Sequence, residues 1–204
     1  MSGQFVSGLV LAAGASSRLG QPKQLLPFRG TTLLGWVVAQ HGSCAALDEV
    51  IVVLGNAIEE VRIQVTFGNA KVVKNLGAAQ GCASSYRVGI GALNPKSEAM
   101  VVLLGDQPGV DHHCIEAVVS SWKQNGGKIV LANYRGQKGH PMLFSRELFD
   151  QMIGLHGDKA VWKLVDQHPE WVREVPIDRD RPKDINTWED YQSVLVGHDQ
   201  PQGL

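Results

Sequence analysis

Apolar runs recur along this chain, and the segments between them have the spacing of amphipathic helices. Five runs are apolar or β-branched without alternation, a pattern typical of strands buried on both faces of a parallel sheet. These runs are residues 8–12, 49–54, 71–73, 99–104 and 128–132. Their alternation with helices predicts an α/β fold of three layers, in which helices flank a mostly parallel sheet.

The helical segments also show where two of the helices begin. Apolar spacing predicts helices over 33–41, 85–93, 115–122, 158–165 and 187–196. Asp111 is a good N-cap for the helix containing 115–122. Thr187 is an N-cap for the last helix, and Asp190, three residues on, completes a loose capping box.

The pattern changes after residue 133. Residues 133–141 are rich in glycine and predict a strand that turns into a short strand at 142–144, so we expect the sheet to be mixed at this edge. No repeat, linker or charge run divides the chain. We therefore expect one domain over 1–197 and a disordered polar tail over 198–204.

Composition narrows the class of function. The 204 residues carry a formal net charge of -1, which argues against a nucleic-acid binder with a basic surface. No apolar run is long enough for a membrane span, and the N-terminus lacks the pattern of an export signal, so a cytoplasmic location is expected. The three cysteines, Cys44, Cys82 and Cys114, have no CxxC spacing and are expected to be thiols without a metal or disulfide role.

A glycine-containing loop with two cations follows the first predicted strand. It reads Leu11-Ala12-Ala13-Gly14-Ala15-Ser16-Ser17-Arg18-Leu19-Gly20-Gln21-Pro22-Lys23. Its glycines let backbone N–H groups approach an anion, and Arg18 and Lys23 add positive charge, which together suit a polyphosphate. The loop is neither a P-loop nor a dinucleotide fingerprint. The alternative is a glycine-rich turn whose cations face water.

Asp106 ends the buried strand 99–104 and gives the loop a carboxylate partner. Ligands of open α/β sheets bind beyond the carboxyl ends of strands, so Asp106 and the loop should converge on one crevice. A carboxylate opposite a triphosphate suggests Mg²⁺, with Asp184 or Asn186 as a second oxygen donor. The alternatives are that Asp106 caps a turn and that 184–187 is an ordinary turn and cap.

These residues together resemble the MobA-like nucleotidyltransferases. Residues 11–23 are similar to the family's LAAGxSxRxGxxK signature, and 104–108, LGDQP, to its metal-binding strand end. The other similar positions are Asn75, Gly81, Ser84, Ser85 and Gly89 around the base and ribose, Gly139-His140-Pro141 on the acceptor side, the Gly157-Asp158 turn, and the tail 184–190. The resemblance covers nearly the whole chain and implies a Rossmann-like nucleotidyltransferase fold.

Within that family the chain is most similar to the molybdenum cofactor cytidylyltransferases. Ala13 completes LAAG where the guanylyltransferase branch usually has LAGG, and this favours CTP. Two positions depart from the pattern. Asn186 stands where the family usually has Asp, so metal affinity should be weaker. Residues 159–162 lack the glycine often found after the GD turn, which leaves the acceptor open.

The resemblance implies an enzyme that transfers a nucleoside monophosphate, preferably CMP from CTP, to the terminal phosphate of an acceptor such as molybdopterin, with release of pyrophosphate. A molybdoenzyme or its chaperone is an implied partner. The other hypotheses are transfer to a sugar or polyol phosphate, a glycosyltransferase, and a non-catalytic module that binds a nucleotide or cofactor. A glycosyltransferase would typically show a DxD motif where this chain has Asp106-Gln107-Pro108.

The resemblance also assigns roles to residues. Arg18, Lys23 and Asp106 are the expected catalytic residues, and Asp106 and Asn186 the expected Mg²⁺ ligands. The expected nucleotide-binding residues are Leu11, Ala12, Ala13, Gly14, Ala15, Ser16, Ser17, Arg18, Lys23, Asn75, Gly81 and Ser84. Gly139, His140 and Pro141 are expected to bind the acceptor, although His140 could instead pack beside Pro141.

Overall fold

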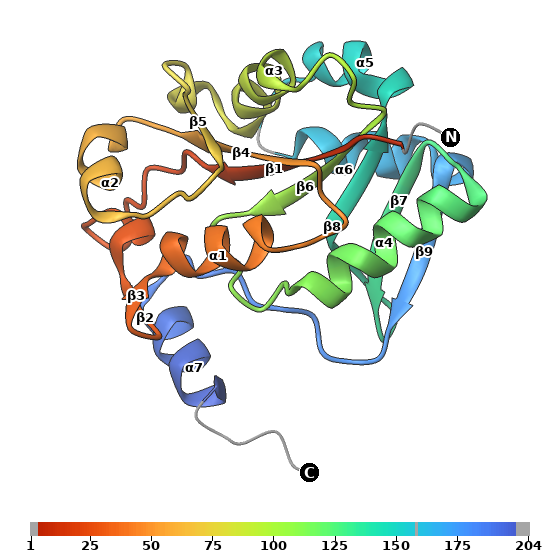
Figure 1. The fold of residues 1–204 in the computed structure, drawn as a ribbon. Coiled ribbons are helices and arrows are strands. Elements are labelled where there is room, and N and C mark those ends of the chain that lie inside the picture. The colour runs from red at the N-terminus through yellow and green to blue at the C-terminus, as the bar shows by residue number, and fades with distance from the viewer. Residues whose placement is uncertain (1–3, 158, 199–204) are drawn as a thin grey trace.

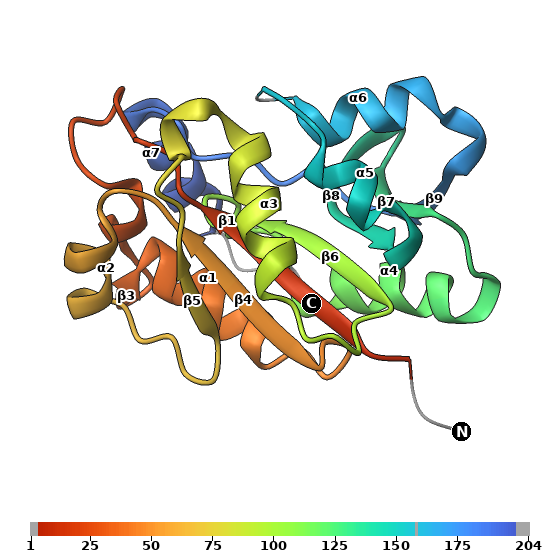
Figure 2. The same cartoon turned by 90° about the horizontal axis from the view of Figure 1, so that it is seen from above.

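A mixed sheet forms the centre of the computed structural model, which describes residues 4–157 and 159–198 (Figures 1 and 2). Within those residues the sheet has seven strands in the order β5-β4-β1-β6-β8-β7-β9. They are β1 (Val6–Ala12), β4 (Glu49–Leu54), β5 (Lys71–Lys74), β6 (Ala99–Leu104), β7 (Ile129–Tyr134), β8 (Gln137–Ser145) and β9 (Val172–Ile177). Only β8 runs antiparallel to its neighbours β6 and β7, which confirms the predicted mostly parallel, mixed sheet.

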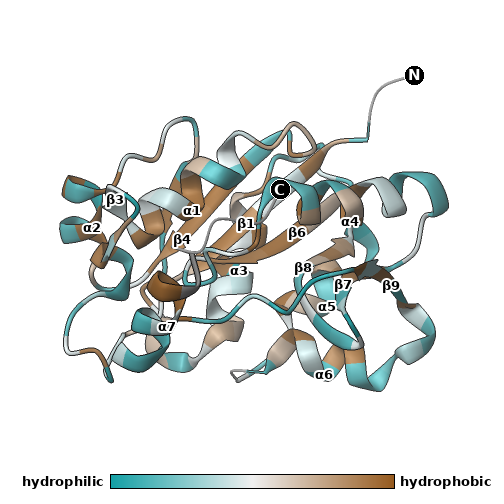
Figure 3. Cartoon of the chain, turned by 90° about the horizontal axis from the view of Figure 1, so that it is seen from below, coloured by the Kyte–Doolittle hydropathy of each residue, from teal (hydrophilic) through white to brown (hydrophobic). Residues whose placement is uncertain are grey.

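Helices cover both faces of this sheet, so the fold has the three predicted layers (Figure 1). One layer contains α1 (Leu33–Gly42), α2 (Ile58–Gln64) and α4 (His112–Asn125), and the other α3 (Cys82–Ala92), α5 (Phe149–Ile153) and α6 (Ala160–Gln167). Side chains of β1 alternate between the layers: Val6 and Val10 join the first core, and Leu9 and Leu11 the second. The central strands are accordingly the most hydrophobic part of the ribbon in Figure 3.

A third, smaller core fixes the C-terminal helix α7 (Trp188–His198). It contains Leu19 from the loop after β1, Phe28 from the ribbon of β2 (Pro27–Phe28) and β3 (Thr31–Thr32), and Ile185 and Val194 from the C-terminal part. Ile185 is fully buried there. Its neighbours Asp184 and Asn186 are thereby held close to the loop after β1.

The predicted helix starts agree with the hydrogen bonds. Asp111 caps α4 by accepting from Cys114 N at 3.1 Å. Thr187 and Asp190 form a reciprocal capping box, with N–H donation to Thr187 Oγ1 at 3.1 Å and to Asp190 Oδ2 at 2.8 Å. The helix expected over 158–165 is α6 at Ala160–Gln167; Asp158 and residues 199–204, most of the expected tail, lie outside the described residues.

Other elements differ from the prediction. The helix expected over 85–93 begins at Cys82, and β8 is longer than 142–144 because a two-residue turn joins it directly to β7. The turn residues Arg135 and Gly136 have φ of 49° and 92°, as in a type I′ hairpin. Three elements of the main fold, α2, α5 and β9, and the β2–β3 ribbon were not predicted.

Two expectations from composition can be compared with the structure. In the structure, no disulfide joins Cys44, Cys82 and Cys114. Among the described residues, no helix combines the length and hydropathy that crossing a bilayer requires.

Candidate active site

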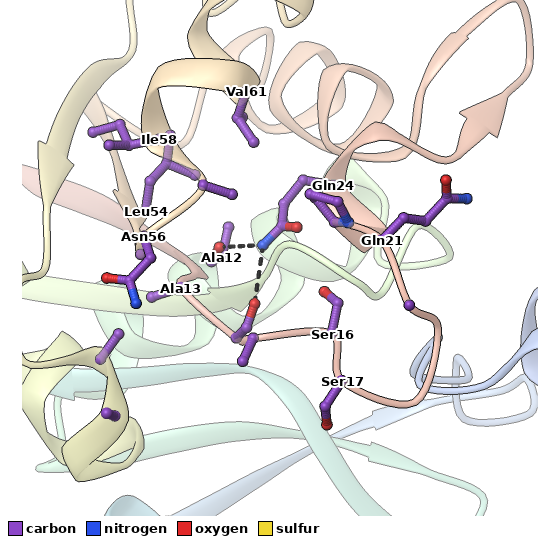
Figure 4. Close-up of a pocket in the computed structure, with 18 residues that line it drawn as sticks. Ala12, Ala13, Ser16, Ser17, Gln21, Gln24, Leu54, Asn56, Ile58 and Val61 are labelled. Atoms are coloured by element: carbon purple, nitrogen blue, oxygen red, sulfur yellow. Dashed lines mark hydrogen bonds between the residues drawn. The ribbon is translucent and has the colours of Figure 1, made fainter.

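Two adjoining cavities open at the carboxyl ends of the parallel strands β1, β4 and β6. The first, about 450 Å³, is lined by the loop after β1, by the turn between β4 and α2, and by Ala78 and Ala79 (Figure 4). The second, about 330 Å³, reaches Asp106 after β6 and Asp184 in the C-terminal segment. They share the wall formed by Ala12, Ala13, Gly14, Ala15, Gln24 and Ala78. This is the crevice expected at the carboxyl edge of an open sheet.

The loop after β1 is held by its own hydrogen bonds. Ser16, with a positive φ of 54°, accepts from Lys23 N at 3.0 Å through its hydroxyl. A Cβ on Gly55, after β4, would stand 2.5 Å from Ala13 O, so only glycine allows the β4 turn to approach the loop this closely. These contacts fix the shape of the loop.

Lys23 binds three oxygen atoms from distant parts of the chain. Its ammonium forms an ion pair with Asp106 Oδ2 and donates to Asn186 Oδ1 at 3.0 Å and to Ile185 O at 3.2 Å. The side chains of Lys23 and Asp106 are only 14% and 16% exposed. Ile185 N donates to Asp106 O at 2.9 Å, which fixes the C-terminal segment against the end of β6.

These three oxygens are the ligand type that hard divalent cations prefer. Among the described residues no group of three or more His, Cys, Asp or Glu side chains could hold a metal. A cation bound here would therefore take one carboxylate, amide and carbonyl oxygens, and oxygens from a ligand or water. Such a donor set fits Mg²⁺ or Mn²⁺, which complete their coordination with phosphate and water.

Asp184 lines the second cavity beside Asp106. Gln107 orients it by donating from Nε2 to Asp184 Oδ1 at 2.8 Å and to Pro182 O at 3.0 Å. Burial and the neighbouring charge of Asp106 raise the pKa of Asp184. With both carboxyl groups in its lining, the second cavity is suited to attract a cation.

The similarity of this chain to known proteins agrees with the geometry of the site. Residues 8–172 match the MobA-like NTP transferase domain. The chain belongs to this family. Its fold is accordingly that of the nucleotidyltransferases, as the order of its strands and helices already indicated.

The names of the relatives of this MobA-like chain describe different activities. Nicotine blue oxidoreductase of Paenarthrobacter nicotinovorans is 31% identical over 93% of both chains. Molybdenum cofactor cytidylyltransferase of Escherichia coli is 27% identical over 71% of this chain and 72% of that protein. A crystal structure of Rv0371c from Mycobacterium tuberculosis in complex with manganese is 35% identical, covers 94% of this chain and 98% of its own, and superposes with a TM-score of 0.83.

Most of the expected nucleotide-binding residues of this MobA-like domain line a cavity, whereas Asn75 and Ser84 do not. The residues from Leu11 to Ala15, Lys23 and Gly81 line the second cavity, and Ser16 and Ser17 line the first. Asn75 and Ser84 lie behind the wall: Asn75 Nδ2 donates to Ser84 Oγ at 2.8 Å and to Ser85 Oγ at 3.0 Å. Asn75 Oδ1 also accepts from Gly77 N at 2.9 Å, so this side chain shapes the segment that reaches the cavity.

Arg18 and the acceptor-side residues lie outside both cavity walls. Arg18 is exposed on the loop, where its charge lowers the pKa of Asp190 in α7, after the larger effect of the Thr187 hydrogen bond. Gly139, His140 and Pro141 belong to β8 and lie toward the carboxyl end of β6, because Val102 pairs with Met142 in an antiparallel register.

His140 is buried as an uncharged imidazole. Burial lowers its pKa to about 4, and the charge of Arg181 contributes in the same direction. Its ring meets Trp162 edge-on with centroids 6.1 Å apart, while its Nε2 is buried with no partner among the described residues. His140 therefore packs against Trp162, and its Nε2 remains available to a ligand.

The lining residues that sequence reasoning missed include Gln24, Asn56 and Cys82. Asn56 follows the carboxyl end of β4, so the rule that identified Asp106 would have found it. Cys82 begins α3, whose start was placed three residues too late. Gln24 lies between Lys23 and the apolar residues that begin at Leu25, and nothing in this local sequence marks it as a site residue.

Proposed function

We propose that this chain transfers CMP from CTP to the terminal phosphate of an acceptor of the molybdopterin type and releases pyrophosphate. The observation that supports it best is the convergence of the loop after β1, Lys23, Asp106 and Asn186 on one cavity edge. Family membership supports an NTP substrate. The cytidylyltransferase relative and Ala13 support CTP and the acceptor.

The reaction needs little covalent chemistry from the protein. An oxygen of the acceptor phosphate attacks the α-phosphorus of the nucleotide, and the bond from that phosphorus to the bridging oxygen breaks, leaving with its electron pair in pyrophosphate. The attacking phosphate is already ionised near neutral pH, so no general base is required. The work of the site is alignment and stabilisation of charge on the phosphates.

Different residues would align the substrates and stabilise the charge on the phosphates. Backbone N–H groups of the loop would hold the β- and γ-phosphates, and Lys23 would interact with the α-phosphate. Asp106 and Asn186, with Ile185 O, would hold a divalent cation, whose chemistry when bound is to neutralise phosphate oxygens. Arg18 would approach the departing pyrophosphate from its exposed position. Neutral His140 would face the acceptor.

The name of one relative supports a second candidate. Nicotine blue oxidoreductase shares 31% identity over nearly all of both chains, so a redox reaction on a nitrogen heterocycle is the alternative. It would require an electron donor such as a reduced nicotinamide nucleotide. The two candidates consume different substrates and are separable by assay.

The test is a screen for pyrophosphate release that crosses CTP, GTP, ATP and UTP, each with Mg²⁺, against molybdopterin forms and sugar phosphates. Release with CTP and molybdopterin above all other pairs is the expected result. Release with a sugar phosphate would replace the acceptor. No release from any pair, with oxidation of NADH or NADPH by a heterocyclic dye, would replace the reaction class.

A further inference from the structure

Gln24 is the buried polar side chain that both cavities share. It follows Lys23 in the short 3-10 helix Lys23–Leu25, and it is only 4% exposed. It lines the first and the second cavity. A glutamine with so little contact with water must have a role in the packing or hydrogen bonding of the wall around it.

The amide group of Gln24 binds two backbone carbonyl groups of the loop after β1. Its Nε2 donates to Ala12 O at 2.6 Å and to Gly14 O at 3.4 Å, as the dashed lines in Figure 4 show. Its Oε1 is buried with no partner among the described residues. The opposite orientation of the amide would place Oε1 against two carbonyl oxygens, so the two carbonyls decide which way the group points.

Those two carbonyls belong to the segment that meets the ligand. A carbonyl oxygen directed at a polyphosphate repels it, whereas a backbone N–H attracts it. The Gln24 donor occupies both Ala12 O and Gly14 O, so neither carbonyl oxygen is left free to face a bound anion. The peptide N–H groups from Ala13 to Ala15 are then the groups of this segment that could bind the phosphates.

We propose that Gln24 is a positioning residue, which fixes the polarity of the loop so that its N–H groups face the phosphates of a bound nucleotide. The inference rests on the proposed function. It goes beyond it by assigning phosphate affinity to a side chain that needs no contact with phosphate. Because Gln24 acts through the backbone, its contribution should be the same for every nucleobase.

Two variants and one matched control test this role. Gln24→Met keeps the length of the side chain and removes the donor. Gln24→Glu places an acceptor against the two carbonyls. Gln64→Glu is the control: Gln64 is exposed on α2 and lines neither cavity, so the change from Gln to Glu adds the same charge without disturbing Ala12 or Gly14.

Calorimetry with CTP, GTP, ATP, UTP and inorganic tripolyphosphate, each with Mg²⁺, gives the affinities, and circular dichroism confirms folding at the assay temperature. Gln24→Met should bind each probe about tenfold more weakly, and Gln24→Glu about a hundredfold, the sizes expected for losing and then reversing a buried hydrogen bond. Gln64→Glu should change affinity by no more than about threefold because its charge lies outside both cavities and is screened.

Three outcomes would overturn the inference. If the folded Gln24 variants bind like wild type, the glutamine supports the fold alone. A loss of affinity for one nucleotide alone, with tripolyphosphate binding unaffected, would mean that Gln24 recognises the nucleobase. If wild type binds none of the five probes, the proposed function fails and this inference with it, which distinguishes that failure from the other two.

Discussion

At the amino ends of β1 and β4 the polar groups bind one another, whereas at the carboxyl ends several buried ones have no partner. Near the amino ends, Glu49 Oε1 accepts from Ser7 Oγ at 2.6 Å and from Asn94 N at 2.7 Å, and Asp48 Oδ2 accepts from Val6 N at 2.7 Å. Near the carboxyl ends, Gln24, Gln107 and His140 each bury a polar atom with no partner among the described residues.

This difference indicates that polar groups at the amino edge of the sheet serve stability, whereas those at the carboxyl edge serve ligand binding. Buried polar atoms without a protein partner are commonly satisfied by water or a ligand, and three of them lie near the carboxyl edge. The polar groups named at the amino edge bind one another. The carboxyl edge keeps polar atoms, cavities and the ion pair of Lys23 with Asp106 together. Substitutions at the two edges should therefore have opposite consequences.

The largest expected effect is on turnover at the carboxyl edge. Lys23→Ala and Asp106→Ala should each lower pyrophosphate release about a hundred- to a thousandfold, because each removes charge stabilisation at the phosphates. The matched change at the amino edge is Glu49→Gln, which should cost about 1–3 kcal/mol of unfolding free energy and leave kcat unchanged. Steady-state kinetics and urea denaturation of the three variants measure both quantities.

Near-normal turnover of both carboxyl-edge variants would defeat the catalytic assignment. A fall in kcat for folded Glu49→Gln would instead remove the distinction between the edges.

Sequence alone predicted the elements whose signal lies in long apolar runs. The central strands and the loop after β1 were found because buried parallel strands have no polar alternation and ligands bind at their carboxyl ends. The convergence of Asp106 and Asn186 near the loop followed from the same rule and the family resemblance. Helix α2 was missed because only Ile58 and Val61 are buried in it, so its apolar pattern is weak.

Other features depend on tertiary contacts that no local pattern records. Strand β9 is an edge strand with Pro176 inside it, and its pairing with β7 decides its conformation. The sequence suggested that Asn75 contacts the nucleoside, but it could not show that the side chain is already bonded to Ser84, Ser85 and Gly77. Gln24 was missed because its partners are backbone atoms ten and twelve residues away.

The second prediction concerns pH and the histidines. Burial lowers the pKa of both His41 and His140 to about 4. The unfolded chain takes up these protons below its usual pKa of about 6.5, and the native state only near 4, so unfolding free energy falls as pH falls through that window. At about pH 5 each histidine should account for a loss of about 2 kcal/mol relative to neutral pH, measured by urea denaturation.

His140→Gln should remove about half of this pH-dependent loss. The exposed His113→Gln is the control and should retain all of it. An equal pH dependence in all three proteins would show that other groups cause it.

A third prediction is that Lys23 competes with a divalent cation and lowers its affinity about tenfold. The Lys23 ammonium occupies the three oxygens of Asp106, Asn186 and Ile185 that would hold a divalent cation. Without nucleotide, Lys23→Met should therefore bind Mn²⁺ about tenfold more tightly than wild type, since a charged competitor is gone. Asn186→Ala should bind it more weakly. Electron paramagnetic resonance of free Mn²⁺ measures both affinities, and equal values for wild type and Lys23→Met would contradict a shared oxygen set.

The smallest effect distinguishes two arginines that hold the segment between β9 and α7. Arg179 donates to Asp111 Oδ2 at 2.8 Å and to Gly109 O at 2.9 Å, and it is partly buried. Arg135, at the hairpin tip, pairs with Asp178 and Asp180, whose side chains are 95% and 94% exposed. Exposed ion pairs contribute little because water and salt screen them, whereas a partly buried hydrogen bond to a backbone carbonyl is only partly replaced by water when it is lost.

Arg179→Met should therefore lower the unfolding free energy by about 1–2 kcal/mol and raise the KM for nucleotide, because the segment that brings Asp184 and Asn186 to the cavity loses its anchor. Arg135→Met should leave the denaturation midpoint and the KM within experimental error. If Arg135→Met alone raised the KM, the hairpin tip would have to be the anchor of the segment. The functional edge would then extend beyond the cavity to the exposed end of β7 and β8.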